Sequence, residues 1–479
     1  MMGQQDGQKE LFSYQVDLDK RVRADHPLRA IAAQIDFSFV RPEVAQFYGK
    51  KGNTSIDPVI ILKMIFLLFF DDIASERELM AIIAERLDYL WFLGYGLNDE
   101  IPNHSVLSKA RRRWGPEVFE SFFVRTVMQC VEAGLVDGKK IHVDASLVDA
   151  NASKDSVLKS SPELIAAVKK AYGAQESKLE DTNTPESYQS VNDRLVSTTD
   201  PDAAAVRKGG QPSRPRYHHH RVIDDANAVI TAVETTPGSI AENRKLMDLV
   251  EQHGQNTQQA AKIVVADHKY GTAENYVACQ LRGIQTHLGD VLGKQQDHYD
   301  GIFPDTAFAY QAQDNTYRCP ASQVMKPRRL HPQKRTWEYH LPKGVCARCE
   351  LRAQCTRSKT GRTIHRHEHQ SLLEQARAQA HSRAALMSRR RRQIIVELSF
   401  ADATNNHGFK RARWRRLWRQ QIQDWLIAGI QNIRILLSRS VLKKAAAAQV
   451  LPLPQEGAAV CLILKLLAML LQPLRFQQR

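Results

Sequence analysis

Apolar residues recur at helical spacing through the first part of the chain. The run Val59–Phe70 is apolar on nearly every side, so we expect a central core helix there. Ser75 and Glu78 have the spacing of a capping box and predict the start of the next helix. A later helix is expected to stop at Gly134, because glycine readily ends a helix. The pattern therefore predicts an all-helical domain over residues 1–135.

Alternation replaces helical spacing after residue 139. Three apolar residues alternate with three polar ones, namely Ile141, Val143 and Ala145 with His142, Asp144 and Ser146. This is the pattern of a strand with one buried face. Asp144 then lies in mid-strand, where a buried carboxylate needs a basic side chain or a metal ion beside it. The alternative is an aspartate on the solvent face of an edge strand.

Two further acids lie in predicted elements, one at the end of a strand and one on a helix. Asp267 follows the apolar run 263–266, at the carboxyl end of the strand that this run predicts. Glu397 lies on a predicted helix, two turns after Arg390. With Asp144, these acids form an all-oxygen set, which suits Mg²⁺ or Mn²⁺ better than zinc. Two such ions about 3.5 to 4 Å apart can hold both oxygens of an in-line phosphoryl transfer.

The segment between these acids has two parts. Residues 153–216 lack apolar order except for a helix expected over Pro162–Tyr172, so we interpret them as a flexible insertion. Strands are then expected at His218–Ile223 and Val229–Thr235, joined as a hairpin. Consecutive strand residues point to opposite faces, so His218–His220 are not expected to bind one metal ion.

Four of the seven cysteines cluster within residues 288–370. They are Cys319, Cys346, Cys349 and Cys355. Four thiolates in a short polar segment, two of them spaced C-x-x-C, favour a structural zinc site, and free structural thiols are the alternative. Cys130, Cys279 and Cys461 stand in apolar helical patterns and are expected in the core.

The charge of the chain favours a polyanionic partner. Lys and Arg number 67 against 52 Asp and Glu, giving a net charge of +15 and a pI near 9.5. Nucleic acid is the first expectation and an anionic membrane the second. The N-terminus has no apolar signal segment, and the apolar runs 59–70 and 458–471 are shorter than the ~20 residues of a spanning helix. We therefore expect a soluble, cytoplasmic protein.

Basic residues mark the surfaces that could contact DNA. Arg111, Arg112 and Arg113 end a predicted helix, where they could contact phosphates or only complement the helix dipole. Residues 401–440 carry eight bases against two acids, with Trp414 and Trp418 interleaved. The alternative there is a solvated basic face with inward tryptophans. The candidate DNA-binding residues are Arg111, Arg112, Arg113, Arg390, Lys410, Arg411, Arg413 and Arg416.

Taken together, these segments resemble the DDE transposases of bacterial insertion sequences, in the branch with a helical N-terminal domain and a cysteine-rich insertion. The resemblance runs from about Asp25 to Arg439. Its most specific segments are 142–154, 266–271, 346–355, 396–402 and 407–413. Matched position by position, it makes Asp144, Asp267 and Glu397 the catalytic, metal-binding triad. Two positions differ from the family pattern: Thr404 stands where a base is frequent, and Arg416 where glycine is frequent.

The resemblance implies an α/β fold: a ribonuclease-H-like core, an all-α N-terminal domain and a small zinc-ribbon-like insertion. The expected domains are a DNA-binding domain at 1–135, the core at 136–287 and 371–440, the insertion at 288–370, and an appended tail at 441–479. The implied function is Mg²⁺- or Mn²⁺-dependent cleavage and strand transfer at the ends of its own element. A nucleoid-associated homo-oligomer is expected. The alternatives are a catalytically degenerate DNA-binding protein and a ribonuclease-H-like repair nuclease.

Overall fold

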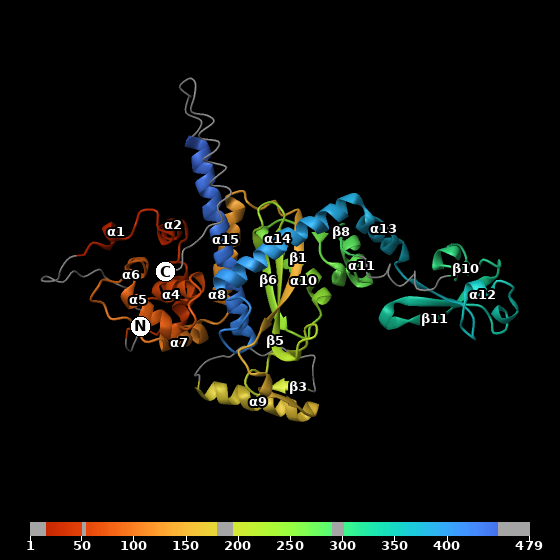
Figure 1. The fold of residues 1–479 in the computed structure, drawn as a ribbon, viewed down its shortest axis with the longest axis horizontal. Helices are drawn as coiled ribbons and strands as arrows, with labels where there is room; N and C mark the ends of the chain where they lie inside the picture. The colour runs from red at the N-terminus through yellow and green to blue at the C-terminus, as the bar shows by residue number, and fades with distance from the viewer. Residues whose placement is uncertain (1–15, 50–53, 180–194, 290–300, 449–479) are drawn as a thin grey trace, which may run out of the picture. The chain divides into compact units, whose positions relative to one another are not determined.

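The structure is a computed structural model that describes residues 16–49, 54–179, 195–289 and 301–448 (Figure 1). The chain divides into two compact units, one ending at Leu436 and the other beginning at Leu437. All contacts described below lie within the first unit. The apolar run 458–471, Cys461 and most of the expected tail lie outside the described residues.

The first part of the chain is helical, as predicted. Its helices are α1 (Leu18–Arg21), α2 (Pro27–Gln34), α3 (Val40–Val44), α4 (Pro58–Phe70), α5 (Glu76–Glu85), α6 (Leu87–Leu93), α7 (Ser105–Trp114) and α8 (Glu117–Glu132). α4 is buried along most of its length, which confirms the predicted core helix. The Ser75 hydroxyl accepts a hydrogen bond from the Glu78 backbone N–H at 3.1 Å, so the predicted cap begins α5.

A six-stranded mixed sheet forms the centre of the first unit. Its strands are β1 (Lys140–Asp149), β4 (Ala204–Val206), β5 (Arg214–Asp224), β6 (Ile230–Pro237), β7 (Ile263–Val265) and β8 (Gln285–His287). The order is β4-β5-β1-β7-β8, and β6 also pairs with β5. β5 runs antiparallel to β1, whereas β7 is parallel to both β1 and β8. The predicted strands and the hairpin are therefore confirmed.

Helices cover this sheet and close the fold. They are α10 (Leu246–Thr257), α11 (Ala273–Leu281), α13 (Gln370–His381), α14 (Arg383–His407) and α15 (Leu417–Ala448), with the short 3₁₀ turns η3 (Glu242–Lys245) and η4 (His268–Tyr270). One apolar core joins β1, β5, β6 and β7 to α10, α11 and α13. Figure 1 shows α14 running beside the sheet, and its residues contact β1, β7 and β8.

The segment 153–216 is more ordered than its composition predicts. It contains η2 (Lys154–Ser156), β2 (Val157–Lys159), α9 (Pro162–Leu179) and β3 (Leu195–Ser197), and β4 joins the central sheet. Asp200 and Asp202 are buried there. α9 confirms the helix that was expected over Pro162–Tyr172. The short strands were not predicted, because polar partners, which leave no apolar periodicity, hold this part of the segment. Residues 180–194 lie outside the described residues.

The cysteine-rich insertion folds around a sheet of its own. Its strands are β9 (Ala309–Gln311), β10 (Thr316–Arg318), β11 (Val324–His331), β12 (Thr336–His340) and β13 (Thr363–His367), antiparallel and in sequence order. η6 (Asp305–Ala307), η7 (Pro332–Lys334), η8 (Cys346–Arg348) and α12 (Arg352–Cys355) complete it. Phe308, Tyr317, Met325, Tyr339 and Ile364 form its small core. This insertion therefore has an apolar centre independent of any metal ion.

Among the described residues, no helix combines the length and the apolar character that crossing a membrane requires.

Candidate active site

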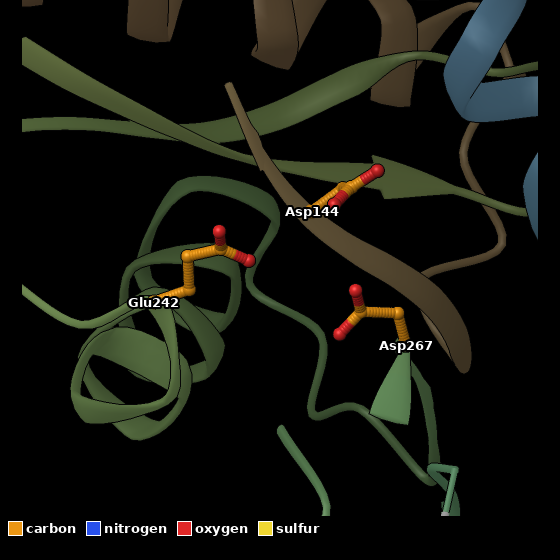
Figure 2. Close-up of side chains that lie close together, drawn as sticks. All are labelled: Asp144, Glu242 and Asp267. Atoms are coloured by element: carbon orange, nitrogen blue, oxygen red, sulfur yellow. The ribbon is translucent and has the colours of Figure 1, made fainter. Parts of the chain in front are cut away.

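Three carboxylates meet beside the central sheet (Figure 2). Asp144 projects from β1, Asp267 follows the end of β7, and Glu242 begins η3. One oxygen from each carboxylate lies within 4.8 Å of the other two. Parallel pairing of β1 with β7 places the two aspartates at adjacent strands, which explains how residues so distant in sequence come together. A group of oxygen ligands this close suits a hard divalent cation.

The local backbone fixes Asp267. Its side chain accepts a hydrogen bond from the Lys269 backbone N–H at 2.9 Å and so caps η4. The next helix, α11, starts after Thr272, which accepts from the Asn275 backbone N–H. The predicted order of strand, acid, turn and helix is therefore confirmed around Asp267.

Basic side chains balance two of the three acids. Arg392 of α14 places Nη1 2.9 Å from Asp144 Oδ2. Lys269 Nζ lies 2.8 Å from Glu242 Oε1, and His218 Nε2 lies 3.4 Å from the same oxygen. Two of the three negative charges therefore already have basic groups beside them before any metal ion binds.

The pKa values of these acids follow from burial and from their partners. Burial raises the pKa of Asp144, and Asp267 and Glu242 raise it further, although Arg392 opposes them. Burial also acts to raise the pKa of Glu242, but the bonds from His218 and Lys269 outweigh it and lower that pKa. The negative charge of Glu242 is thus stabilised by its neighbours, while that of Asp144 depends on a nearby cation.

Glu397 lies apart from this group. It is exposed on α14, and among the described residues the close group of metal-ligand type contains Asp144, Glu242 and Asp267 but not Glu397. It follows Arg392 by five residues, a rise of about 7.5 Å along the helix. The structure therefore brings together two of the three acids expected from the sequence, with Glu242 as the third member.

Sequence reasoning missed Glu242 because its local pattern is ordinary. An acid in the first turn of a helix is explained by the helix dipole alone. What distinguishes Glu242 is its position in the fold. It follows β6, which pairs with β5, and β5 is the antiparallel partner of β1. That position becomes visible only once the strand order is known.

Polar contacts hold α14 beside the sheet on both sides of Glu397. Arg391 Nε donates to Asp225 Oδ1 at 2.8 Å, in the turn after β5. Further along, Arg221 of β5 donates through Nη1 to the Ser399 hydroxyl at 2.7 Å. Asp144 of β1 and Arg221 of β5 lie opposite each other in the sheet. The contact that holds the helix of Glu397 is therefore made directly beside Asp144.

Two of the arginines expected to bind DNA are buried in ion pairs instead. Arg111 is 3% exposed, pairs with Glu76 and lies 3.9 Å from the centre of the Trp414 ring. Arg416 is 6% exposed, and its Nε lies 2.9 Å from Asp202 Oδ2. Both guanidinium groups are engaged inside the protein, so this placement corrects the expectation that they contact phosphates.

The other basic candidates differ in exposure. Arg113, Arg390, Lys410 and Arg411 are exposed, whereas Arg112 and Arg413 are half-buried. Arg413 pairs with Asp72. Lys410 donates to the Ser146 hydroxyl at 2.6 Å, two residues after Asp144 on β1. Lys410 is therefore an exposed base close to the strand that carries the acidic site.

The four clustered cysteines line one cavity of about 810 Å³ in the insertion. Burial raises the pKa of the Cys355 thiol, and Cys346, Cys319 and Cys349 raise it further, so the four thiols are near enough to influence one another. Their sulfurs do not form a close metal-ligand group in the described part of the chain. Cys130 and Cys279 are buried, as predicted, and burial raises the pKa of each to about 12.

Two models of protein families match parts of the chain. A family model described as "Transposase domain (DUF772)" matches residues 16–113. A second, described as "Transposase DDE domain", matches residues 318–437, which include the cysteine cluster and Glu397. None of the curated proteins matches the chain.

Structural comparison finds complexes of the Mos1 transposase. A paired-end complex with the left transposon end has 10% sequence identity, covers 50% of this chain and 60% of that chain, and gives a TM-score of 0.16. A strand transfer complex has 10% identity, coverages of 50% and 59%, and a TM-score of 0.16. A mariner paired-end complex with Mn has 11% identity, coverages of 52% and 64%, and a TM-score of 0.15. The chain thus spans less than two thirds of each, and such scores do not establish a common fold.

Proposed function

We propose that the chain is an insertion-sequence transposase of the DDE class, which cleaves DNA at the ends of its element and joins them to new DNA by divalent-metal phosphoryl transfer. The observation that carries this proposal is the meeting of Asp144 and Asp267 with a third carboxylate beside a mixed sheet. We favour this over a catalytically degenerate DNA-binding protein because a protein without the chemistry has no need to hold three acids together.

The strand arrangement supports a ribonuclease-H-like core. β6, β5 and β1 form an antiparallel series, and β7 and β8 continue the sheet parallel to β1. One aspartate lies on β1 and the other directly after β7, so the site lies where the parallel part of the sheet begins. α14, the helix that carries Glu397, contacts β1, β7 and β8.

In the proposed mechanism, Asp144 and Asp267 would hold Mg²⁺ or Mn²⁺, and Glu397 would join them when DNA is bound. The bound ions supply activation of a water or a 3′ hydroxyl as nucleophile and stabilisation of the leaving oxygen. The chain's own part is to fix the ligands. Burial makes Asp144 dependent on a cation, and the cap on η4 holds Asp267 in one orientation.

A cleavage assay tests this proposal. Purified protein is incubated with DNA carrying its own element ends, with and without Mg²⁺ or Mn²⁺. We expect metal-dependent nicking that Asp144→Asn and Asp267→Asn abolish while end binding persists. The control is Asp137→Asn, which alters an exposed acid paired with Lys139 before β1. Cleavage by the Asp144→Asn protein at the wild-type rate would overturn the proposal.

We further propose that the exposed bases hold the DNA backbone. Arg113, Arg390, Lys410 and Arg411 remain available after the buried arginines are set aside. Lys410 is linked to the strand of the site by its bond to Ser146, two residues after Asp144. Replacing a base that contacts phosphate weakens binding to all DNA sequences alike. It also reduces the slope of the logarithm of the binding constant against the logarithm of salt concentration by about one. Equal salt slopes for Lys410→Gln and wild-type protein would exclude this contact.

A structural zinc ion in the insertion is proposed as well. Four thiols around one cavity provide the donor set of a Cys₄ site, although their sulfurs would have to approach one another to bind zinc. Because this region has its own apolar core, zinc would order the cysteine-bearing loops rather than replace that core. We expect about one zinc per chain by elemental analysis and its loss in Cys349→Ser. Wild-type protein purified without zinc would instead identify free structural thiols.

The proposed partners are the ends of the element and its target DNA. Because two ends must be cut and joined, we propose that the active form is at least a dimer, working at the bacterial nucleoid.

A further inference from the structure

Tyr270 carries a buried hydroxyl on η4, the turn that Asp267 caps. The residue ends η4, three positions after Asp267, and is fully buried. Among the residues that the structure describes, none forms a hydrogen bond with its hydroxyl. Burial raises the pKa of the phenol well above its usual value, and the charges of Glu242, Asp144 and Asp267 raise it further. An unpaired hydroxyl in this position is costly unless a further group meets it.

Glu242 is held in place from two sides. Lys269 reaches it from η4 and His218 from β5, and its side chain is 11% exposed. These contacts come from elements that also frame Asp144 and Asp267, so the carboxylate is oriented by the site itself rather than by solvent. Figure 2 shows it pointing toward the two aspartates. A pre-oriented carboxylate loses little freedom when it binds a cation.

We propose that Glu242 is a ligand of the divalent-ion site together with Asp144 and Asp267, and that the Tyr270 hydroxyl bonds to a water of the bound ion. The inference rests on the proposed function and deepens it. Mg²⁺ and Mn²⁺ take oxygen ligands, and Mg²⁺ usually keeps several waters. Such a water supplies the partner that the buried hydroxyl needs. Glu242 therefore serves ion binding by the DNA-free protein, a role distinct from that of Glu397 on α14.

Mn²⁺ binding without DNA tests this assignment. Free Mn²⁺ is measured by electron paramagnetic resonance as the full-length protein is titrated. We expect Glu242→Gln to weaken Mn²⁺ binding by tenfold or more, and Tyr270→Phe by about tenfold, as for groups that support a metal site indirectly. Glu397→Gln should leave the affinity within about twofold of wild type. The control, Glu251→Gln, alters an acid of α10 that pairs with Arg282.

The variants separate the outcomes. Unchanged Mn²⁺ affinity in folded Glu242→Gln and Tyr270→Phe, with binding lost in Asp144→Asn, overturns the assignment of Glu242 but leaves the proposed function intact. If Asp144→Asn also binds Mn²⁺ normally, the metal-dependent function fails too. Should Glu242→Gln not fold, Tyr270→Phe decides, because it retains the ring and removes only the hydroxyl; normal Mn²⁺ binding by this variant overturns the proposal.

Discussion

Replacing Arg392 tests how the acidic site is balanced before it binds metal. Arg392 Nη1 lies 2.9 Å from Asp144 Oδ2, and the two side chains are 12% and 21% exposed. Opposite charges at such a separation attract by about 6 kcal/mol at an effective dielectric constant of 20. Breaking a fully buried pair costs about 3–5 kcal/mol. Because this pair is partly exposed, we expect Arg392→Gln to lower the free energy of unfolding by about 2–3 kcal/mol.

A divalent ion should reverse part of this loss. With Arg392 replaced, Asp144 faces Asp267 and Glu242 without its own cation, so a bound ion relieves the repulsion among all three. A ligand that binds only the folded state at 100 times its Kd stabilises it by about 2.7 kcal/mol. We therefore expect Mn²⁺ to stabilise Arg392→Gln more than wild-type protein, in which the guanidinium group competes for Asp144.

Urea unfolding followed by tryptophan fluorescence, with and without Mn²⁺, measures both effects. The control is Arg391→Gln, which removes the neighbouring pair with Asp225. The Arg391 side chain is 52% exposed, so its loss should cost at most about 1 kcal/mol, and Mn²⁺ should not alter that cost. Equal losses in the two variants, or the same gain from Mn²⁺ in Arg392→Gln and wild type, would refute this account of the site.

Three further predictions concern the surroundings of the site. A Cβ on Gly271 would lie 1.8 Å from the Gly289 carbonyl oxygen, so Gly271→Ala should lower the melting temperature and the Mn²⁺ affinity together, and an unchanged melting curve would contradict this. Burial raises the pKa of Asp200 from 3.8 to about 7, so the folded state holds this proton more tightly than the unfolded state. The free energy of unfolding should therefore fall as pH rises between these values. Asp200→Asn should reduce this pH dependence, as measured by urea unfolding from pH 4 to 7. Ser399→Ala removes a hydrogen bond from the buried Arg221, at a cost of about 1.5–3 kcal/mol, and should slow cleavage more than end binding; equal effects on both would argue against a role in placing α14.

The sequence predicts the positions of Asp144 and Asp267 because each lies in a simple pattern. Alternation marks β1, and a short apolar run marks β7. Parallel neighbours in a sheet then bring the two acids together without further information. Glu242 has no such pattern, since its place depends on how β6 pairs with β5 and on contacts from His218 and Lys269.

The exposure of the basic residues could not be predicted from the sequence. A helix-terminal arginine and a surface arginine look alike in sequence, yet Arg111 is buried over Trp414 while Arg113 is exposed. The helix α14 raises a similar problem, because polar contacts rather than an apolar stripe fix it against the sheet. Its bonds to Asp225 and Arg221 join residues far apart in the chain, which no local periodicity reveals.

Arg416 shows how such a distant contact can reverse the meaning of a residue. The transposase family that the sequence resembles tends to have glycine at this position. The φ of Arg416 is +81°, a conformation that costs residues other than glycine roughly 1–2 kcal/mol. In this chain Asp202 pairs with the Arg416 side chain, and Asp200 accepts from its backbone N–H at 3.1 Å. Both acids come from the segment that looks unstructured in sequence. That segment therefore stabilises a strained arginine, and Arg416 is structural, so the proposed phosphate binding in this region rests on Lys410 and Arg411.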